Sequence, residues 1–277
     1  MGEWTEFDVE ANGLRLRVTR TGQGDKPVVV CAHGFTDDGL CWTPLARALE
    51  GEYDLILPDA RGHGQSEAPA GTFTYVDLAD DLAALIRALG LARPVVLGHS
   101  MGAVTAMLLA ARYPELVRAV ALEDPPAWWP PRAEPLFGDG WRPGARAWVE
   151  SLQRHSAAEL ADMEHRNQPK WAADELPPWA ASKLAFDLRF IDWARPGALP
   201  WPEAAARMTC PALLLTGDPA LGAAVADEDA AALAAAVPTL RRAHVPGAGH
   251  NVRRDQFAAY LAALRPALAA WSAAGKG

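Results

Sequence analysis

The stretch that decides the fold begins at Val95 and reads Val95-Val96-Leu97-Gly98-His99-Ser100-Met101-Gly102. Its apolar beginning predicts a buried strand, and apolar positions spaced three and four apart from Met101 to Arg112 predict a helix directly after it. Between them lies a Gly-x-Ser-x-Gly pattern, in which a serine sits on a strained strand-to-helix turn and glycines leave room for the neighbouring strand and helix. The segment predicts that Ser100 is a catalytic nucleophile and that the N–H of Met101 points into its pocket.

Other short apolar runs recur along the chain, with helical patterns between them. Residues 14–19 alternate apolar and polar side chains, which predicts an edge strand after a turn at Asn12-Gly13. Near-continuous apolar runs are typical of parallel strands that are covered on both faces. Such runs occupy residues 28–32, 55–57, 94–97, 119–122 and 212–215, with 242–245 as the last candidate. The alternation predicts an α/β fold with a doubly wound, mostly parallel sheet.

The alternation stops between about Pro125 and Ala206. This stretch contains eight of the eleven tryptophans and twelve of the 23 prolines. Helical patterns occur within it, around 145–154 and 157–167, whereas no apolar strand run does. We therefore expect a sheet-based core made of residues 1–124 and 207–277, and a helical cap inserted at 125–206.

The overall composition suits a globular protein with a sizeable core. The chain has 277 residues and a formal net charge of −8 without a basic stripe, which argues against nucleic acid or an anionic membrane as a partner. Three cysteines form no disulfide framework and no metal-ligand spacing, and the first twenty residues show no signal peptide. We expect a cytoplasmic monomer or homodimer that needs no metal and no cofactor.

Together with the serine motif, three further segments carry a resemblance to the α/β-hydrolase family over nearly the whole chain. His33-Gly34-Phe35 follows the first buried strand, and the resemblance implies that the N–H of Phe35 joins that of Met101 in an oxyanion hole. Val245-Pro246-Gly247-Ala248-Gly249-His250 follows the last candidate strand, which implies that His250 is the general base. Residues 59–66 resemble the family's Asp-x-Arg-Gly-x-Gly-x-Ser loop, which we interpret as structural.

The carboxylate that should orient His250 has two candidate positions. The family usually places it three residues past a glycine after the strand at 212–215, where this chain has Ala220, although Asp218 is close by. A second position, at the end of the strand after the nucleophile helix, is used by some haloalkane dehalogenases, a zearalenone lactonase and pancreatic lipase. That strand end here reads Leu122-Glu123-Asp124-Pro125, which favours Asp124 as the acid and leaves Asp218 as the alternative.

The resemblance also implies that the inserted cap covers the active site and sets its specificity. Its tryptophans indicate an apolar, aromatic-lined cavity, and Trp128 and Trp129 are expected near the mouth of the pocket because they follow the strand end directly. The predicted function is a serine hydrolase that cleaves apolar or aromatic esters or lactones through an acyl-enzyme. The alternatives are a cofactor-free haloperoxidase or perhydrolase, a carbon–carbon bond hydrolase, and a ligand-binding receptor with slow turnover.

Overall fold

A computed structural model describes residues 4–126, 140–195 and 201–273 of the chain. Its centre is an eight-stranded sheet with the strand order β1-β2-β4-β3-β5-β6-β7-β8. Strands β1 and β2 pair antiparallel, β2 also joins β4 antiparallel, and the remaining neighbours run parallel. The strands are β1 Thr5–Ala11, β2 Leu14–Arg20, β3 Val28–Ala32, β4 Asp54–Pro58, β5 Val95–His99, β6 Ala119–Glu123, β7 Ala212–Thr216 and β8 Leu240–His244. The doubly wound, mostly parallel sheet expected from the sequence is confirmed.

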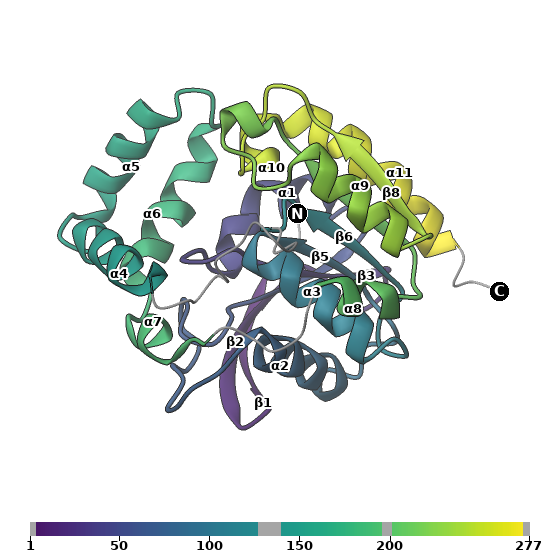
Figure 1. Cartoon of the computed structure of the whole chain (residues 1–277). Helices are drawn as coiled ribbons and strands as arrows, with labels where there is room; N and C mark the ends of the chain where they lie inside the picture. Colours follow the sequence, from purple (N-terminus) through teal and green to yellow (C-terminus); the bar gives the residue numbers. More distant parts are fainter. Residues whose placement is uncertain (1–3, 127–139, 196–200, 274–277) are drawn as a thin grey trace.

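Helices cover both faces of the sheet (Figure 1). The α-helices are α1 Thr43–Leu49, α2 Tyr75–Ala88, α3 Met101–Arg112, α4 Trp141–Leu152, α5 Ala157–Asn167, α6 Leu176–Ala185, α7 Arg189–Trp193, α8 Trp201–Arg207, α9 Asp227–Ala236, α10 Val252–Asp255 and α11 Phe257–Ala273. Three short 3₁₀ turns are η1 Gly39–Trp42, η2 Ala173–Glu175 and η3 Pro219–Leu221. No helix within the described ranges combines the length and the apolar character that crossing a bilayer requires.

The alternation of side chains along each strand divides the core into two layers. Val96 of β5 packs in one hydrophobic cluster with α2, α3 and α9, whereas its neighbours Val95 and Leu97 pack in the other with α1 and α11. Every residue of β5, β6 and β7 is buried, as continuous apolar runs predict for central parallel strands. Burial on both faces fixes the register of these strands, because a shift by one residue would exchange the two layers.

The outer strands depart from the sequence-based expectation. The sequence predicts a buried strand at 242–245, but β8 is the edge of the sheet and its residues are half-buried or exposed. Strand β1 was not predicted, because its side chains are mostly exposed or half-buried and its apolar content is low. A strand that has one neighbour and one solvated side does not need a continuous apolar run.

Helices α4, α5, α6 and α7, which we call the cap helices, stand together beside the sheet (Figure 1, left). They have a small core of their own, in which Leu160 of α5 packs with Leu152, Trp171 and Trp179. Helix α8 differs, because Ala204 and Ala205 belong to the same cluster as the core helix α3. The cap helices rise beside the carboxyl ends of the parallel strands, where open α/β sheets bind their ligands.

Candidate active site

Ser100 occupies a sharp turn between β5 and α3. Its backbone has φ 50° and ψ −116°, a conformation that residues other than glycine rarely adopt. A Cβ on Gly98 would overlap the carbonyl group of Gly102, and a Cβ on Gly102 would overlap the carbonyl group of Ala32. The two glycines therefore let β5, α3 and β3 approach closely enough to raise the serine above the edge of the sheet.

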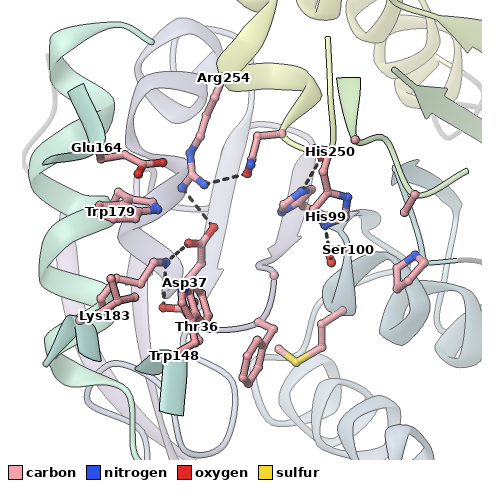
Figure 2. A pocket seen from close by; sticks show the side chains of 18 of the residues that line it. Thr36, Asp37, His99, Ser100, Trp148, Glu164, Trp179, Lys183, His250 and Arg254 are labelled. Carbon is pink, nitrogen blue, oxygen red and sulfur yellow. Dashed lines mark hydrogen bonds and ion pairs between the residues drawn. The ribbon is translucent and has the colours of Figure 1, made fainter. Parts of the chain in front are cut away.

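Three side chains that lie far apart in the sequence form a continuous row of hydrogen bonds. The Nε2 atom of His250 lies 2.9 Å from the Oγ atom of Ser100, and its Nδ1 atom lies 2.7 Å from the Oδ2 atom of Asp124. With Asp124 ionised, Nδ1–H donates to the carboxylate and Nε2 is left to accept the serine proton. Figure 2 shows the imidazole of His250 directed at Ser100.

Asp124 reaches His250 from a buried position at the end of β6. It is completely inaccessible to solvent and adopts φ 41°. Its carboxylate also accepts hydrogen bonds from the backbone N–H groups of Ala224 and Val225, at 2.7 and 3.2 Å. The loop that follows β7 thus holds the carboxylate of Asp124 in place through two backbone donors.

The alternative acid, Asp218, lies elsewhere in the same loop region. Its Oδ2 atom accepts the N–H of Gly247 at 2.7 Å, and its Oδ1 atom lies 2.9 Å from Nε2 of His244. About a third of its side chain is exposed. Asp218 therefore supports the backbone of the loop that leads to His250, while the contact with the imidazole is made by Asp124.

His99 holds the same loop from the other side. Burial lowers the pKa of His99 well below its ordinary value, so its imidazole is neutral and carries one N–H. Its Nε2 atom lies 3.0 Å from the backbone carbonyl oxygen of His250 and donates to it. This contact was not anticipated from the sequence, because it joins residues 151 positions apart.

The residues expected at the oxyanion hole lie next to Ser100. Phe35 and Met101 both line the cavity that contains Ser100 and His250. A Cβ on Gly34 would come within 3.4 Å of the Cβ of Ser100, so the backbone before Phe35 passes directly beside that serine. Met101 begins α3, whose first turn has no side-chain cap, and such a helix terminus favours a developing negative charge.

The cavity around Ser100 has a volume of about 590 Å³ and is closed on one side by the cap helices. The cap contributes an aromatic and aliphatic wall that includes Trp141, Trp148, Leu160, Trp171 and Trp179. The ring of Trp141 packs against the ring of Phe35, with 5.2 Å between centroids. Trp128 and Trp129, which the sequence analysis placed at the pocket mouth, lie outside the described residues.

A buried polar cluster forms another part of the wall (Figure 2). It consists of Asp37 and the three cations around it, Lys183, Arg253 and Arg254, and we call it the Asp37 cluster. Asp37 lies 2.6 Å from Nζ of Lys183 on α6 and 3.1 Å from Nη2 of Arg254 on α10. Burial by itself would raise the pKa of Asp37, but the positive charges of Arg254, Lys183 and Arg253 hold that pKa well below its ordinary value. This cluster could not be predicted from the sequence. Asp37, Lys183 and Arg254 lie far apart along the chain, and nothing in their local sequence indicates that the fold brings them together.

The chain is similar in sequence to several known hydrolases. A family model described as the alpha/beta hydrolase fold matches residues 27–166. The chain is 37% identical over 116 residues to 2-(acetamidomethylene)succinate hydrolase of Mesorhizobium japonicum, covering 42% of this chain and 41% of that protein. It is 38% identical over 137 residues to epoxide hydrolase A of Mycobacterium tuberculosis, covering 48% of this chain and 42% of that protein. The chain thus spans about two fifths of the length of these relatives.

A solved structure agrees over nearly the whole chain. It is a thermophilic esterase from Thermogutta terrifontis with malate bound, which superposes with a TM-score of 0.70 at 25% identity and covers 97% of this chain and 99% of that one. The similarity therefore extends through the cap and the late strands, beyond the segment matched by the family model.

Proposed function

The chain belongs to the α/β-hydrolase fold family, and from this premise we propose that it is a serine hydrolase cleaving carboxylic esters or lactones. The observation that carries the proposal is the unbroken row Ser100–His250–Asp124, with 2.9 and 2.7 Å between the polar atoms. A serine oxygen, a neutral imidazole and a buried carboxylate in this order are the parts that acyl transfer requires.

In the proposed reaction, His250 takes the proton of Ser100 through Nε2 as the serine oxygen attacks the substrate carbonyl carbon. The negative charge that develops on the carbonyl oxygen is stabilised by the N–H groups of Phe35 and Met101, each contributing about two to three orders of magnitude in rate. The imidazolium then returns the proton to the leaving alkoxide, and an acyl-serine remains. A water molecule activated by His250 releases the acid and regenerates the enzyme.

The likeness to epoxide hydrolases covers less than half of the chain and does not extend to the nucleophile chemistry. Epoxide opening in this fold uses an aspartate nucleophile and cap tyrosines, whereas this chain has Ser100 at the elbow and no tyrosine between residues 125 and 206. The same triad also serves perhydrolases and carbon–carbon bond hydrolases in the family. An ester or lactone carbonyl needs only the groups already described, and we therefore place it first.

The test is covalent labelling combined with turnover. We expect a fluorophosphonate to add one adduct to the wild-type chain, visible by intact mass, and none to Ser100→Ala. We also expect p-nitrophenyl esters and small lactones to be hydrolysed by the wild type and not by that variant. A burst of one equivalent followed by very slow turnover would instead indicate a ligand-binding receptor. Absence of both labelling and turnover would contradict the proposal.

A further inference from the structure

The polar wall of the cavity contains two cations, Lys183 and Arg254, that are already engaged by protein groups. Lys183 has three ammonium hydrogens and three acceptors, the carbonyl oxygen of Thr36 at 3.1 Å, Asp37 at 2.6 Å and the hydroxyl of Ser182 at 3.2 Å. The guanidinium of Arg254 uses three of its five N–H groups, donating to Glu175, Asn251 and Asp37, each at 3.1 Å. Lys183 therefore has no free donor for the carboxylate of a ligand.

The buried positive and negative side chains behind this wall are equal in number. Arg253 lies 3.3 Å from Glu123 and 3.6 Å from Asp37, and all three side chains are buried. Three cations, Lys183, Arg253 and Arg254, therefore face three anions, Asp37, Glu123 and Glu175. When all six groups are ionised, their charges cancel.

Glu164 is the carboxyl group that this balance leaves over. Burial raises the pKa of Glu164, whereas Asn167 and the positive charges of Lys183 and Arg254 favour its ionised form. It lies on the face of α5 that lines the cavity, together with Leu160, Met163 and Asn167 at helical spacing. Its side chain is half-buried and accepts a hydrogen bond from Asn167. Among the described residues it has no ion-pair partner within 4.0 Å. Figure 2 shows Glu164 reaching from the cap side toward Arg254, above Trp179.

The aromatic lining around Glu164 already accommodates positive charge. The guanidinium carbon of Arg254 lies 5.0 Å from the ring centroid of Trp171, and Nζ of Lys183 lies 5.2 Å from that of Trp179. Indole faces attract cations because their π-electrons form a negative quadrupole. A carboxylate that forms no ion pair within 4.0 Å among the described residues, set in a cavity lined by tryptophans, has the chemistry that recognises an ammonium group.

We propose that the cavity binds substrates whose acyl chain ends in a positively charged ammonium group, received by Glu164 and the cap tryptophans. The inference rests on the proposed ester hydrolysis, since it names the substrate class of the same site. It also predicts that a substrate ending in a carboxylate is disfavoured, because Glu164 repels it while Asp37 and Glu175 balance the positive charges of Lys183 and Arg254.

The test uses three methyl esters that differ mainly in their terminal charge. They are the esters of γ-(trimethylammonio)butyrate, of its isosteric tert-butyl analogue and of glutarate as the half-ester. We expect wild-type kcat/KM to be about tenfold higher for the cationic ester than for the neutral one, and lowest for the anionic one. Glu164→Gln should remove the preference, whereas Asp162→Asn, which removes the same charge from the exposed side of α5, should preserve it.

Binding to Ser100→Ala separates this inference from the proposed function. The same three esters are titrated into this variant by calorimetry, with and without Glu164→Gln. Tighter binding of the cationic ester that disappears with Glu164→Gln supports the ammonium site even if the wild type hydrolyses none of the esters. Equal binding of the cationic and neutral esters, or tighter binding of the anionic one, overturns the ammonium site and leaves ester hydrolysis standing.

Discussion

Asp124 combines burial, a left-handed backbone and three hydrogen bonds in a single residue at the end of β6. Its carboxylate receives His250 Nδ1 at 2.7 Å and two backbone N–H groups from the loop after β7. These contacts fix both the position of the carboxylate and, through it, the tautomer of the imidazole. The residue therefore controls which nitrogen of His250 faces Ser100.

Replacing this carboxylate with an amide should separate orientation from binding. We expect Asp124→Asn to lower kcat by about four orders of magnitude with a much smaller change in KM, because the amide favours the wrong imidazole tautomer. Asp218→Asn is the matched control, since Asp218 contacts Gly247 and His244 instead of the imidazole of His250. Steady-state kinetics on p-nitrophenyl esters measures both. A larger loss in Asp218→Asn would transfer the role to that residue.

Asp38 should make stability depend on pH in an unusual direction. Burial, reinforced by the nearby charges of Asp59 and Asp37, raises the pKa of Asp38 from 3.8 to about 7. Between these values the folded chain binds a proton that the unfolded chain has released, so this group stabilises the fold at low pH and loses that contribution as pH rises.

We expect Asp38→Asn to be more stable than wild type at about pH 8 and to lose most of that advantage at about pH 4. The N–H of Leu40 donates a hydrogen bond to Oδ1 of Asp38 at 3.0 Å, and the side-chain oxygen of an asparagine can still accept that bond. Urea unfolding at the two pH values measures the difference. A constant difference between the two proteins would show that Asp38 ionises normally.

At the scale of elements, the junction of β5 and α3 depends on glycines that have no spare volume. A Cβ on Gly102 would overlap backbone atoms of Ala32 and His33, which cannot move without displacing β3. By contrast, Gly144 in the first turns of α4 has no heavy atom within 4 Å of an added Cβ. The same chemical change should therefore have opposite effects at the two sites.

We expect Gly102→Ala to give little folded protein, because the overlap is with backbone rather than with a flexible side chain. Gly144→Ala should raise the free energy of unfolding by roughly 0.5–1 kcal/mol. Alanine has fewer conformations than glycine in the unfolded chain, so it loses less conformational entropy when the helix forms. Circular dichroism and urea unfolding measure the two variants side by side. Normal folding of Gly102→Ala would refute the tight junction.

At the scale of the whole molecule, the Asp37 cluster joins parts that the chain order keeps apart. Asp37 follows the segment His33-Gly34-Phe35, Lys183 belongs to the cap helix α6, and Arg254 follows the loop that contains His250. The partners are 146 and 217 positions apart. One buried carboxylate thus connects the cap helices, the sheet and the loop that carries His250.

Removing that charge should destabilise the entire fold. We expect Asp37→Asn to lower the free energy of unfolding by about 3–5 kcal/mol, because it leaves buried cations without their partner. Asp192→Asn breaks the pair with Arg146 on the cap surface, where both side chains are more than a third exposed, and should cost less than about 1 kcal/mol. Equal small losses in both variants would show that the cluster adds little to stability.

Local sequence determined most of the architecture. Continuous apolar runs marked the central strands, and Gly98, Ser100 and Gly102 marked the turn between β5 and α3, because backbone sterics and burial act on neighbouring residues. The position of His250 late in the chain, after a glycine-rich loop, could likewise be predicted. The exposed strand β1 and the edge position of β8 could not, because a half-solvated strand lacks the continuous apolar signal.

Tertiary structure alone decided the surroundings of the serine. The sequence offered Asp124 and Asp218 for contact with His250, and only the packing of the loop after β7, which donates the N–H groups of Ala224 and Val225, shows that Asp124 makes it. The Asp37 cluster and the unmatched charge of Glu164 were equally invisible in the sequence. Charge pairing and desolvation depend on distances between remote segments, and those distances exist only in the folded chain.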